Sequence, residues 1–306
     1  MNCRTLSFPD SFFLEENRSG YTVSKEQKRI WAVELDLLAK LQLVCEKYDF
    51  RYSVDEGTLL GTIRHGGFIP WDDDIDVCML REDYNKLCRV AATEFCHPYF
   101  FQTEQTNPGS VRGHAQIRNN TTTGILNTEL EHHYLFNQGI FIDIFPLDAV
   151  PDDKDDLSHF VKKADFLRRI ARAYARRSTR VCKTELKRLK VSIPYYFVGK
   201  WFKKNVFYQI YERFIQRYNT CDCQRLANMF LPDLKPSFIY DKQWFRDSIE
   251  MPFEMLTVHV HVGYLDYLRR HYGNWETPIQ GGSIHGGVVF DTEISYTDYF
   301  KSYTVE

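Results

Sequence analysis

The stretch that most constrains this chain is residues 55–76, DEGTLLGTIRHGGFIPWDDDID, which joins a glycine turn, a short helix and an acidic segment. The apolar run before it, Phe50–Val54, predicts a strand. Gly57 and Thr58 end that run and can open a helix, whose free N–H groups attract phosphate. Arg64 lies about two helical turns further on and adds a positive charge. The glycines and the proline that follow predict a loop, and the acidic residues then enter a strand.

The spacing of the acidic residues predicts a metal site. Side chains alternate between the two faces of a strand, so Asp74 and Asp76 point the same way and Ile75 points into the core. Two carboxylates beside a phosphate-binding turn suit Mg²⁺ or Mn²⁺, and without a cation they would repel each other. Asp72 and Asp73 are expected at the mouth, where they orient the strand or hold metal-bound water. A solvated acidic turn is the alternative, but apolar residues follow the acids and favour a strand that runs inward.

A second informative stretch, Gly139–Phe145, is apolar except for Asp143 and predicts a buried strand. An ionised carboxylate without a partner is costly to bury. The economical explanation is that Asp143 faces the same cation as Asp74 and Asp76. The alternative is a structural acid, paired with a buried arginine or with backbone donors.

The same residues resemble a known family. Residues 57–61 (GTLLG), 64–65 (RH), 68–76 (FIPWDDDID) and 142–148 (IDIFPLD) are similar to signatures of the LicD family, which includes bacterial phosphocholine transferases and is related to fukutin and fukutin-related protein. The resemblance covers about residues 28–280 and is discontinuous across the middle. It implies a nucleotidyltransferase-type fold, in which a carboxylate on a neighbouring strand, here Asp143, completes the metal site. The chain departs from the family in having Cys78 where glycine is usual, and in lacking a proline within residues 256–263.

Three sets of site residues are predicted. Catalysis and metal binding are assigned to Asp74, Asp76 and Asp143. Donor binding is assigned to Gly57, Thr58, Gly61, Arg64 and Arg118. Arg118 ends a predicted strand at 113–118, and its guanidinium can bind a phosphate through two parallel hydrogen bonds. An ordinary exposed arginine is the equal alternative. Asp72, Asp73 and Asp148 are expected to support the site from outside the metal ligands, and Asp148 is expected to leave its strand because it follows Pro146.

The predicted fold class is α/β, or α+β on a strict count: a small mixed sheet with surrounding helices and a helical insertion. Within a single catalytic domain of 1–306 we expect a core at 24–150, a basic helical insertion at 151–235 and a segment at 236–306 that packs back on the core. The first helix is expected to begin at Ser24, with Ser24 and Gln27 forming a reciprocal capping box and with one buried face along its length.

Composition limits the function and the location. The net charge of −2 argues against a general nucleic-acid binder. The eight cysteines show no zinc-ligand spacing and suggest a reducing cytosol. The first residues lack a signal-peptide pattern, and no apolar run approaches the roughly 20 residues that span a bilayer. We therefore expect a cytoplasmic protein. Residues 160–204 are rich in lysine and arginine, which indicates either a solvated helical face or a peripheral contact with an anionic membrane or lipid-linked glycan.

The resemblance implies an enzyme that transfers a phosphate ester, phosphocholine first, from a CDP-linked donor to a hydroxyl of a cell-surface glycan such as lipopolysaccharide or teichoic acid, or of its lipid-linked precursor. The residues themselves indicate a metal and a phosphate but not choline. Two alternatives stay open. One is the same chemistry with CDP-ribitol, CDP-glycerol or CDP-ethanolamine, or transfer of a nucleotide. The other is a catalytically silent glycan-binding protein, against which the retention of all three acids argues.

Overall fold

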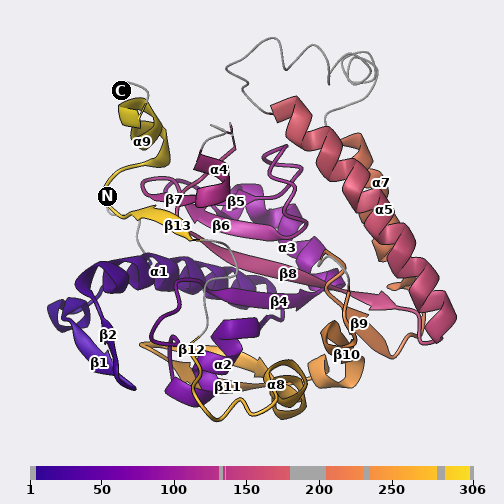
Figure 1. The fold of residues 1–306 in the computed structure, drawn as a ribbon, viewed down its shortest axis with the longest axis horizontal. Helices are drawn as coiled ribbons and strands as arrows, with labels where there is room; N and C mark the ends of the chain where they lie inside the picture. Colours follow the sequence, from indigo (N-terminus) through magenta and orange to yellow (C-terminus); the bar gives the residue numbers. More distant parts are fainter. Residues whose placement is uncertain are drawn as a thin grey trace.

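The computed structural model describes residues 5–130, 134, 136–179, 205–230, 234–280 and 287–303, with the backbone alone at 175–179. Its centre is a mixed sheet of seven strands with helices packed around it (Figure 1). The predicted α/β or α+β class is confirmed. The strand that organises this sheet is β8 (Phe141–Val150), which carries Asp143.

The neighbours of β8 differ along its length. On one side it pairs in parallel with β4 (Asp76–Leu80), which in turn pairs with β3 (Ser53–Val54). On the other side its first half pairs with β6 (Ala115–Asn119) and its last residues pair with β9 (Arg225–Ala227), both antiparallel. Strands β5 (Tyr99–Gln102) and β10 (Ile239–Asp241) extend the sheet beyond β6 and β9.

Two strand predictions were wrong at their boundaries. The acidic strand begins only at Asp76, so Asp72, Asp73 and Asp74 lie in the loop before β4. Strand β8 does not end at Pro146: it continues through Asp148 to Val150, and Pro146 stands opposite Met79 in the pairing with β4. A parallel partner on one side and β9 on the other carry the chain past the proline.

Helix α1 (Lys25–Tyr48) packs against β6 and β8 (Figure 1). Ser24 caps it as predicted, its Oγ accepting from the N–H of Gln27 at 3.2 Å. Only half of the capping box forms, because the Gln27 side chain donates elsewhere. The prediction of one buried face was also wrong for residues 31–39, which are buried on every side. The amino-terminal segment covers the outer face, where the carboxylate of Asp36 accepts from the N–H groups of Thr5 and Leu6.

The remaining elements surround this core. Helices α2 (Glu56–His65) and α3 (Arg81–Glu94) precede and follow the strand that begins with Asp76. The other elements are η1 (Asp10–Phe13), β1 (Glu16–Arg18), β2 (Tyr21–Val23), β7 (Thr123–Leu126), α4 (Asn127–Leu130), η2 (Gln216–Tyr218), η3 (Pro236–Phe238), η4 (Lys242–Phe245), β11 (Ser248–Phe253), β12 (Leu256–His261), α8 (Tyr264–Tyr272), β13 (Val288–Asp291) and α9 (Tyr296–Tyr303).

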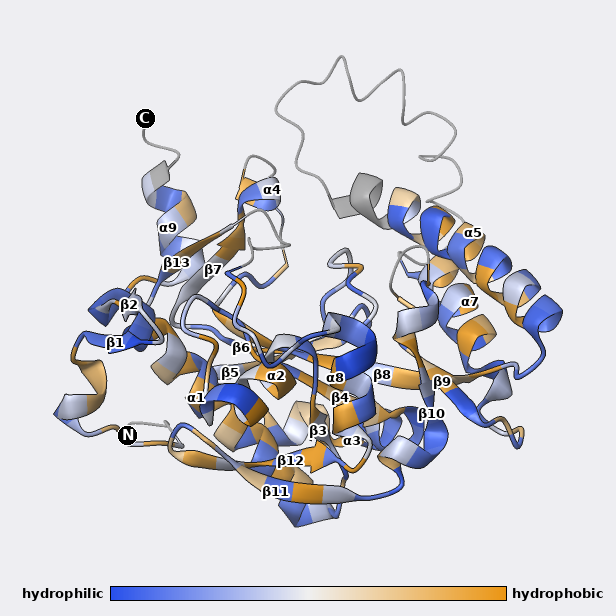
Figure 2. Cartoon of the chain, turned by 60° about the horizontal axis from the view of Figure 1, so that its bottom comes forward, coloured by the Kyte–Doolittle hydropathy of each residue, from blue (hydrophilic) through white to orange (hydrophobic). Residues whose placement is uncertain are grey.

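Helices α5 (Lys154–Thr179) and α7 (Val206–Ile215) pack together at one side of the sheet, where a second apolar cluster includes Phe160, Ala164 and Ala171 (Figure 2). Not every basic residue of α5 faces outward, because the Arg168 side chain is only 6 % exposed and pairs with Asp165. Residues 180–204 lie outside the described residues, so the anionic-membrane contact stays a prediction. Across the described residues no helix combines the length and apolar character needed to cross a membrane. The proposed division into a core, an insertion and a returning segment also stays a prediction.

Asp148 provides a test of the packing around β8. Its carboxylate accepts from Arg81 at 2.8 and 2.5 Å and from the Asn219 amide at 2.8 Å, and the Asp148 and Arg81 side chains are 0 % and 4 % exposed. Asp148→Ala leaves the guanidinium buried without this partner, so we expect the free energy of unfolding to fall by about 3–5 kcal/mol in urea titrations.

The matched control is Glu94→Ala, which removes a pair with Lys47, a side chain that is 58 % exposed. The loss there should stay within about 1 kcal/mol. An Asp148→Ala protein as stable as the parent would show that the Arg81 pair contributes nothing to the fold.

Candidate active site

Three polar side chains form a row across the middle of the sheet. In the parallel pairing of β4 with β8, Asp76 stands opposite Asp143, and in the antiparallel pairing of β6 with β8, Gln116 stands opposite the same residue. Residues opposite each other on adjacent strands project from the same face of a sheet. The fold therefore brings together Asp76 and Asp143, which are 67 residues apart in the chain.

Asp143 is buried and held by two neighbouring side chains. Its Oδ1 accepts from Nε2 of Gln116 at 2.6 Å and lies 3.1 Å from Nε2 of His114. Burial by itself would raise the pKa of Asp143, but the charge and hydrogen bond of His114 and the hydrogen bond of Gln116 outweigh it, and the pKa lies below its ordinary value. The partners are thus a histidine and an amide, and among the contacts described neither an arginine nor a backbone N–H bonds this carboxylate.

His114 and Gln116 are the residues of this group that the sequence did not indicate. His114 immediately precedes β6 and continues the alternation of Gln116 and Arg118 on that strand, while the apolar Ala115 and Ile117 occupy the positions between them. Polar side chains at every second position of a buried strand were the available signal, because they share one face.

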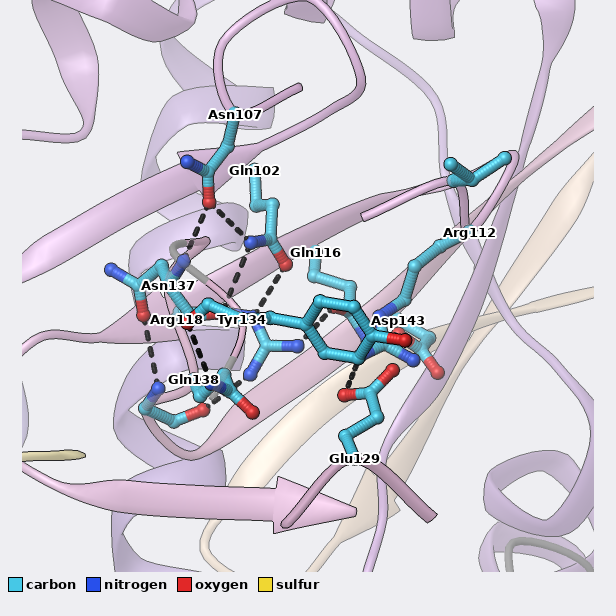
Figure 3. Close-up of polar contacts among 12 residues, drawn as sticks. Gln102, Asn107, Arg112, Gln116, Arg118, Glu129, Tyr134, Asn137, Gln138 and Asp143 are labelled. Atoms are coloured by element: carbon cyan, nitrogen blue, oxygen red, sulfur yellow. Dashed lines mark hydrogen bonds and ion pairs between the residues drawn. The ribbon is translucent and has the colours of Figure 1, made fainter. Parts of the chain in front are cut away.

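Arg118, predicted to meet the donor phosphate, lies behind the row. It is 0 % exposed and donates to the side-chain oxygens of Gln116 and Gln102 at 2.5 and 2.6 Å and to the Gly139 carbonyl at 2.6 Å (Figure 3). These bonds orient the Gln116 amide so that its N–H₂ group faces Asp143. Arg118 therefore reaches the site through Gln116, and a direct phosphate contact, which would require this network to open, stays a prediction.

The acids of the loop are partly buried and lie close to one another. The pKa of Asp74 lies well above its ordinary value, through burial first and then through the charges of Asp72, Asp73 and Asp143. The pKa of Asp76 is also raised, by burial and by Asp74 and Asp143. Burial and Asp73 raise the pKa of Asp72 to about 6. The three predicted catalytic acids thus lie within electrostatic reach of one another.

Side chains of helix α1 form hydrogen bonds with the main chain of this loop. Gln27 Nε2 donates to the carbonyls of Pro70 and Asp72 at 3.0 and 3.1 Å, and Trp31 Nε1 donates to the Asp72 carbonyl at 2.9 Å. The next position on this face is Glu34, which is 1 % exposed and whose Oε2 has no hydrogen-bond partner in the structure. Its pKa is raised well above the ordinary value by burial and by the charges of Asp74, Asp73, Asp72 and Asp143. The sequence analysis missed Glu34, although a glutamate at the centre of an apolar helix was a signal.

Helix α2 begins at the site as predicted, and its residues act on the acids. The Thr58 hydroxyl accepts from the N–H of Asp76 at 2.8 Å, which fixes the start of β4. At Gly57 a Cβ atom would stand 2.7 Å from Oδ2 of Asp72, and at Gly61 it would stand 2.4 Å from the Gly67 carbonyl. Both glycines therefore allow the acidic loop and its neighbour to approach the helix.

Arg64 is partly buried in the last turn of α2. Its Nη1 donates to the Trp275 carbonyl at 3.1 Å, and its Nε lies 2.9 Å from Nε2 of His65. The predicted phosphate contacts of Gly57, Thr58, Gly61 and Arg64 stay predictions.

The donor set suits a hard cation, but it does not form a ready coordination sphere. Buried carboxylates whose charges raise one another's pKa values are the oxygen ligands that Mg²⁺ and Mn²⁺ take. In the conformation described, however, the residues present contain no group of three or more His, Cys, Asp or Glu side chains arranged to hold a metal ion. The metal assignment of Asp74, Asp76 and Asp143 therefore stays a prediction.

His259 and His261 alternate on β12. His261 is 1 % exposed and stacks on Phe245 with ring centroids 4.5 Å apart. Burial lowers its pKa to about 3, so the ring is neutral near pH 7.

Comparisons with known proteins agree with the resemblance. Residues 49–166 match the family described as LicD/FKTN/FKRP, nucleotidyltransferase domain. A lipopolysaccharide cholinephosphotransferase LicD of Haemophilus influenzae is 27 % identical over 244 residues, which cover 79 % of this chain and 88 % of that protein. An uncharacterized protein of Rickettsia prowazekii, RP689, is 30 % identical over 80 residues, 24 % of this chain and 30 % of its own length. The predicted resemblance to the LicD family and the predicted enzyme class, a phosphotransferase, are confirmed.

Glu34 should make the metal-free protein sensitive to pH. Since its pKa in the folded state lies above the ordinary 4.5, stability is lost as the pH rises beyond that value. We expect Glu34→Gln, which cannot ionise, to remove that loss, by about 1.4 kcal/mol for each unit by which the two pKa values differ. Urea unfolding in chelator at about pH 5 and about pH 8 measures it.

The matched control is Glu46→Gln, at an exposed position of the same helix, which should leave the pH dependence as in the parent. If the free energy of unfolding depended on pH equally in Glu34→Gln and in the parent, Glu34 would not be coupled to the acids of the loop.

Asp143 and Asp148 provide a paired test on one strand. Asp143→Ala leaves a histidine and an amide without their acceptor, which should cost about 1–3 kcal/mol, less than Asp148→Ala costs by isolating an arginine. Turnover should be lost in Asp143→Ala, in a protein that still unfolds cooperatively. If Asp143→Ala destabilised the fold as much as Asp148→Ala, Asp143 would be a structural acid.

Proposed function

We propose that the chain transfers phosphocholine from a CDP-linked donor, CDP-choline, to a hydroxyl of a cell-surface glycan such as lipopolysaccharide or its lipid-linked precursor. The observation that carries this proposal is the similarity to the cholinephosphotransferase of Haemophilus influenzae, which extends over 79 % of the chain. The convergence of Asp76 and Asp143 on one face of the sheet supports it, because these are the acids that the family signatures contain.

In the proposed reaction an acceptor hydroxyl attacks the phosphorus that carries choline. The new P–O bond forms as the bond to CMP breaks, and the hydroxyl proton passes to a carboxylate of the cluster. Asp143, whose pKa lies below its ordinary value, is ionised near neutral pH and can accept hydrogen bonds there. His114 and Gln116 hold its Oδ1, so the direction of the carboxylate is set before the substrate arrives.

Asp74, Asp76 and Asp143 are proposed to hold a divalent cation, Mg²⁺ or Mn²⁺. When bound, such an ion neutralises the charge of the donor pyrophosphate and of the departing nucleotide. The amino end of α2 and Arg64 supply positive potential on the same side, where phosphate oxygens would lie. Asp72 and Asp73 support the loop at its mouth. Each of these roles is part of the proposal.

The acceptor and the location belong to the proposal too. A lipid-linked acceptor would bring the protein to the inner face of the membrane, and the basic residues of 160–204 could support a peripheral contact there. On α5, Arg169 has a side chain that is 71 % exposed and pairs with Asp165 at 2.6 Å, whereas Arg168 is buried.

A donor screen tests the proposed reaction. CDP-choline, CDP-ethanolamine, CDP-glycerol and CDP-ribitol are each supplied with Mg²⁺ or Mn²⁺ and a lipopolysaccharide acceptor, and CMP release is followed. We expect CDP-choline to be the preferred donor and a chelator to abolish turnover. Asp76→Asn should reduce turnover by about 100-fold or more, since it removes a charge from the reacting centre.

The control substitution is Asp247→Asn, at an exposed position before β11, which should leave turnover unchanged. Preference for another donor would support the same transfer reaction but contradict the assignment of choline as the transferred group. Turnover that persists in excess chelator would contradict the proposed role of the divalent cation. A folded protein that releases CMP from none of the donors, yet binds the glycan, would instead be a binding protein.

A further inference from the structure

A carboxylate without a cationic partner lies at the start of α2. The Glu56 side chain is 27 % exposed, and its Oε2 stands 3.7 Å from Nδ1 of His271 on α8. Burial lowers the pKa of His271 to about 4, so this imidazole is neutral near pH 7 and provides no positive charge. Burial and the charge of Asp55 raise the pKa of Glu56 to about 8, so its carboxyl group ionises fully near pH 7 only when a cation lies beside it. In the part of the chain that the structure describes, no lysine or arginine is ion-paired with Glu56. Its φ of +43° is a left-handed conformation that residues with a side chain rarely adopt, and such conformations gather at functional sites.

Aromatic rings surround this carboxylate. The rings of Tyr267 and His271 stack with centroids 4.2 Å apart and planes 3° apart, and Tyr240 stacks on Tyr267 at 5.2 Å. Tyr240 and Tyr267 are buried, so they form the base of the cluster. Tyr272, whose ring lies 5.9 Å from that of His271, is 39 % exposed and presents an aromatic surface to solvent beside Glu56.

The aromatic cluster adjoins the acidic site. Helices α8 and α2 lie side by side (Figures 1 and 2), joined by the Tyr267 hydroxyl, which donates to Oδ1 of Asp55 at 2.6 Å. The N–H of Asp55 donates in turn to the Asp76 carbonyl at 2.9 Å. Tyr272 is close enough to the site for the charges of Glu56, Asp55, Asp76 and Asp72 to raise the pKa of its hydroxyl.

We propose that Glu56 and the exposed ring of Tyr272 bind the quaternary ammonium of the donor, with His271 as the apolar wall between them. This assignment rests on the proposed function and names the part of the site that would recognise choline. A trimethylammonium group has no hydrogen to donate, so it is held by aromatic surfaces and by a nearby negative charge. A choline group is short, so its binding site must adjoin the site of the phosphate, as this cluster adjoins Asp76.

The same geometry explains why other donors would be disfavoured. The alditol groups of CDP-glycerol and CDP-ribitol are neutral and need several hydrogen-bonding partners, whereas the Tyr272 ring offers mainly a π surface. A primary ammonium is strongly hydrated and would lose that hydration against the aromatic wall. Discrimination would therefore come from Glu56 through charge and from Tyr272 through the ring.

The test compares Glu56→Gln and Tyr272→Leu with the parent enzyme, using CDP-choline and CDP-glycerol as donors. We expect each substitution to raise KM for CDP-choline by about 3- to 30-fold, the range of a cation–π or an exposed charge contact, with a smaller effect on kcat. Tyr272→Phe keeps the ring and should restore the parent KM. Inhibition by CMP, which lacks choline, should be the same in all four proteins.

Matched controls use the same changes at exposed positions away from the site, Glu250→Gln on β11 and Tyr48→Leu at the end of α1. Calorimetric binding of CDP-choline measures affinity without turnover and should weaken in Glu56→Gln and Tyr272→Leu only. If the parent turns over CDP-choline and both substitutions leave its KM and affinity unchanged, the ammonium site is overturned while the proposed function stands. If the parent does not turn over CDP-choline, the proposed function itself fails.

Discussion

The parallel pairing of β4 with β8 is the interaction on which the rest of the structure depends. It places Asp76 opposite Asp143 in the interior of the folded protein, where the two carboxylates repel each other and neither is well hydrated. The surrounding elements offset this repulsion. Thr58 accepts from the backbone of Asp76, and His114 and Gln116 bind the carboxylate of Asp143. A site of this kind persists because several elements of the fold converge on it.

Strand β8 uses the same residue type in two ways. Asp143, near its beginning, contacts a histidine and an amide and lies on the face that carries the acidic cluster. Asp148, near its end, is fully paired with Arg81 and Asn219. The partner decides the role: an arginine compensates the buried charge of Asp148 completely, whereas a histidine and an amide orient Asp143 through its Oδ1.

The acids of the candidate site could be predicted from the spacing of Asp74 and Asp76 and from the isolated position of Asp143. A carboxylate inside an apolar run is costly to bury unless a partner compensates its charge. The boundaries could not be predicted in the same way. Residues 72–74 form a loop because Gln27 and Trp31 bind the carbonyl of Asp72. These partners lie 45 and 41 residues earlier in the chain. His114 and Glu34 were missed for the same reason: their relation to the acids exists only after β6 and α1 pack against β8 and the loop. Arg118 was expected either to reach the donor phosphate or to be an ordinary exposed arginine, but β6 is an interior strand and buries it.

The ties between α1 and the acidic loop have a consequence for ligand binding. Gln27 and Trp31 donate to main-chain carbonyls of the loop rather than to its carboxylates. The loop is therefore ordered by contacts that a ligand need not replace. Its preorganisation spares an incoming ligand the entropic cost of immobilising the chain, so more of the contact energy remains as affinity. A glutamine at the first turn of a helix thus contributes to recognition without touching what is recognised.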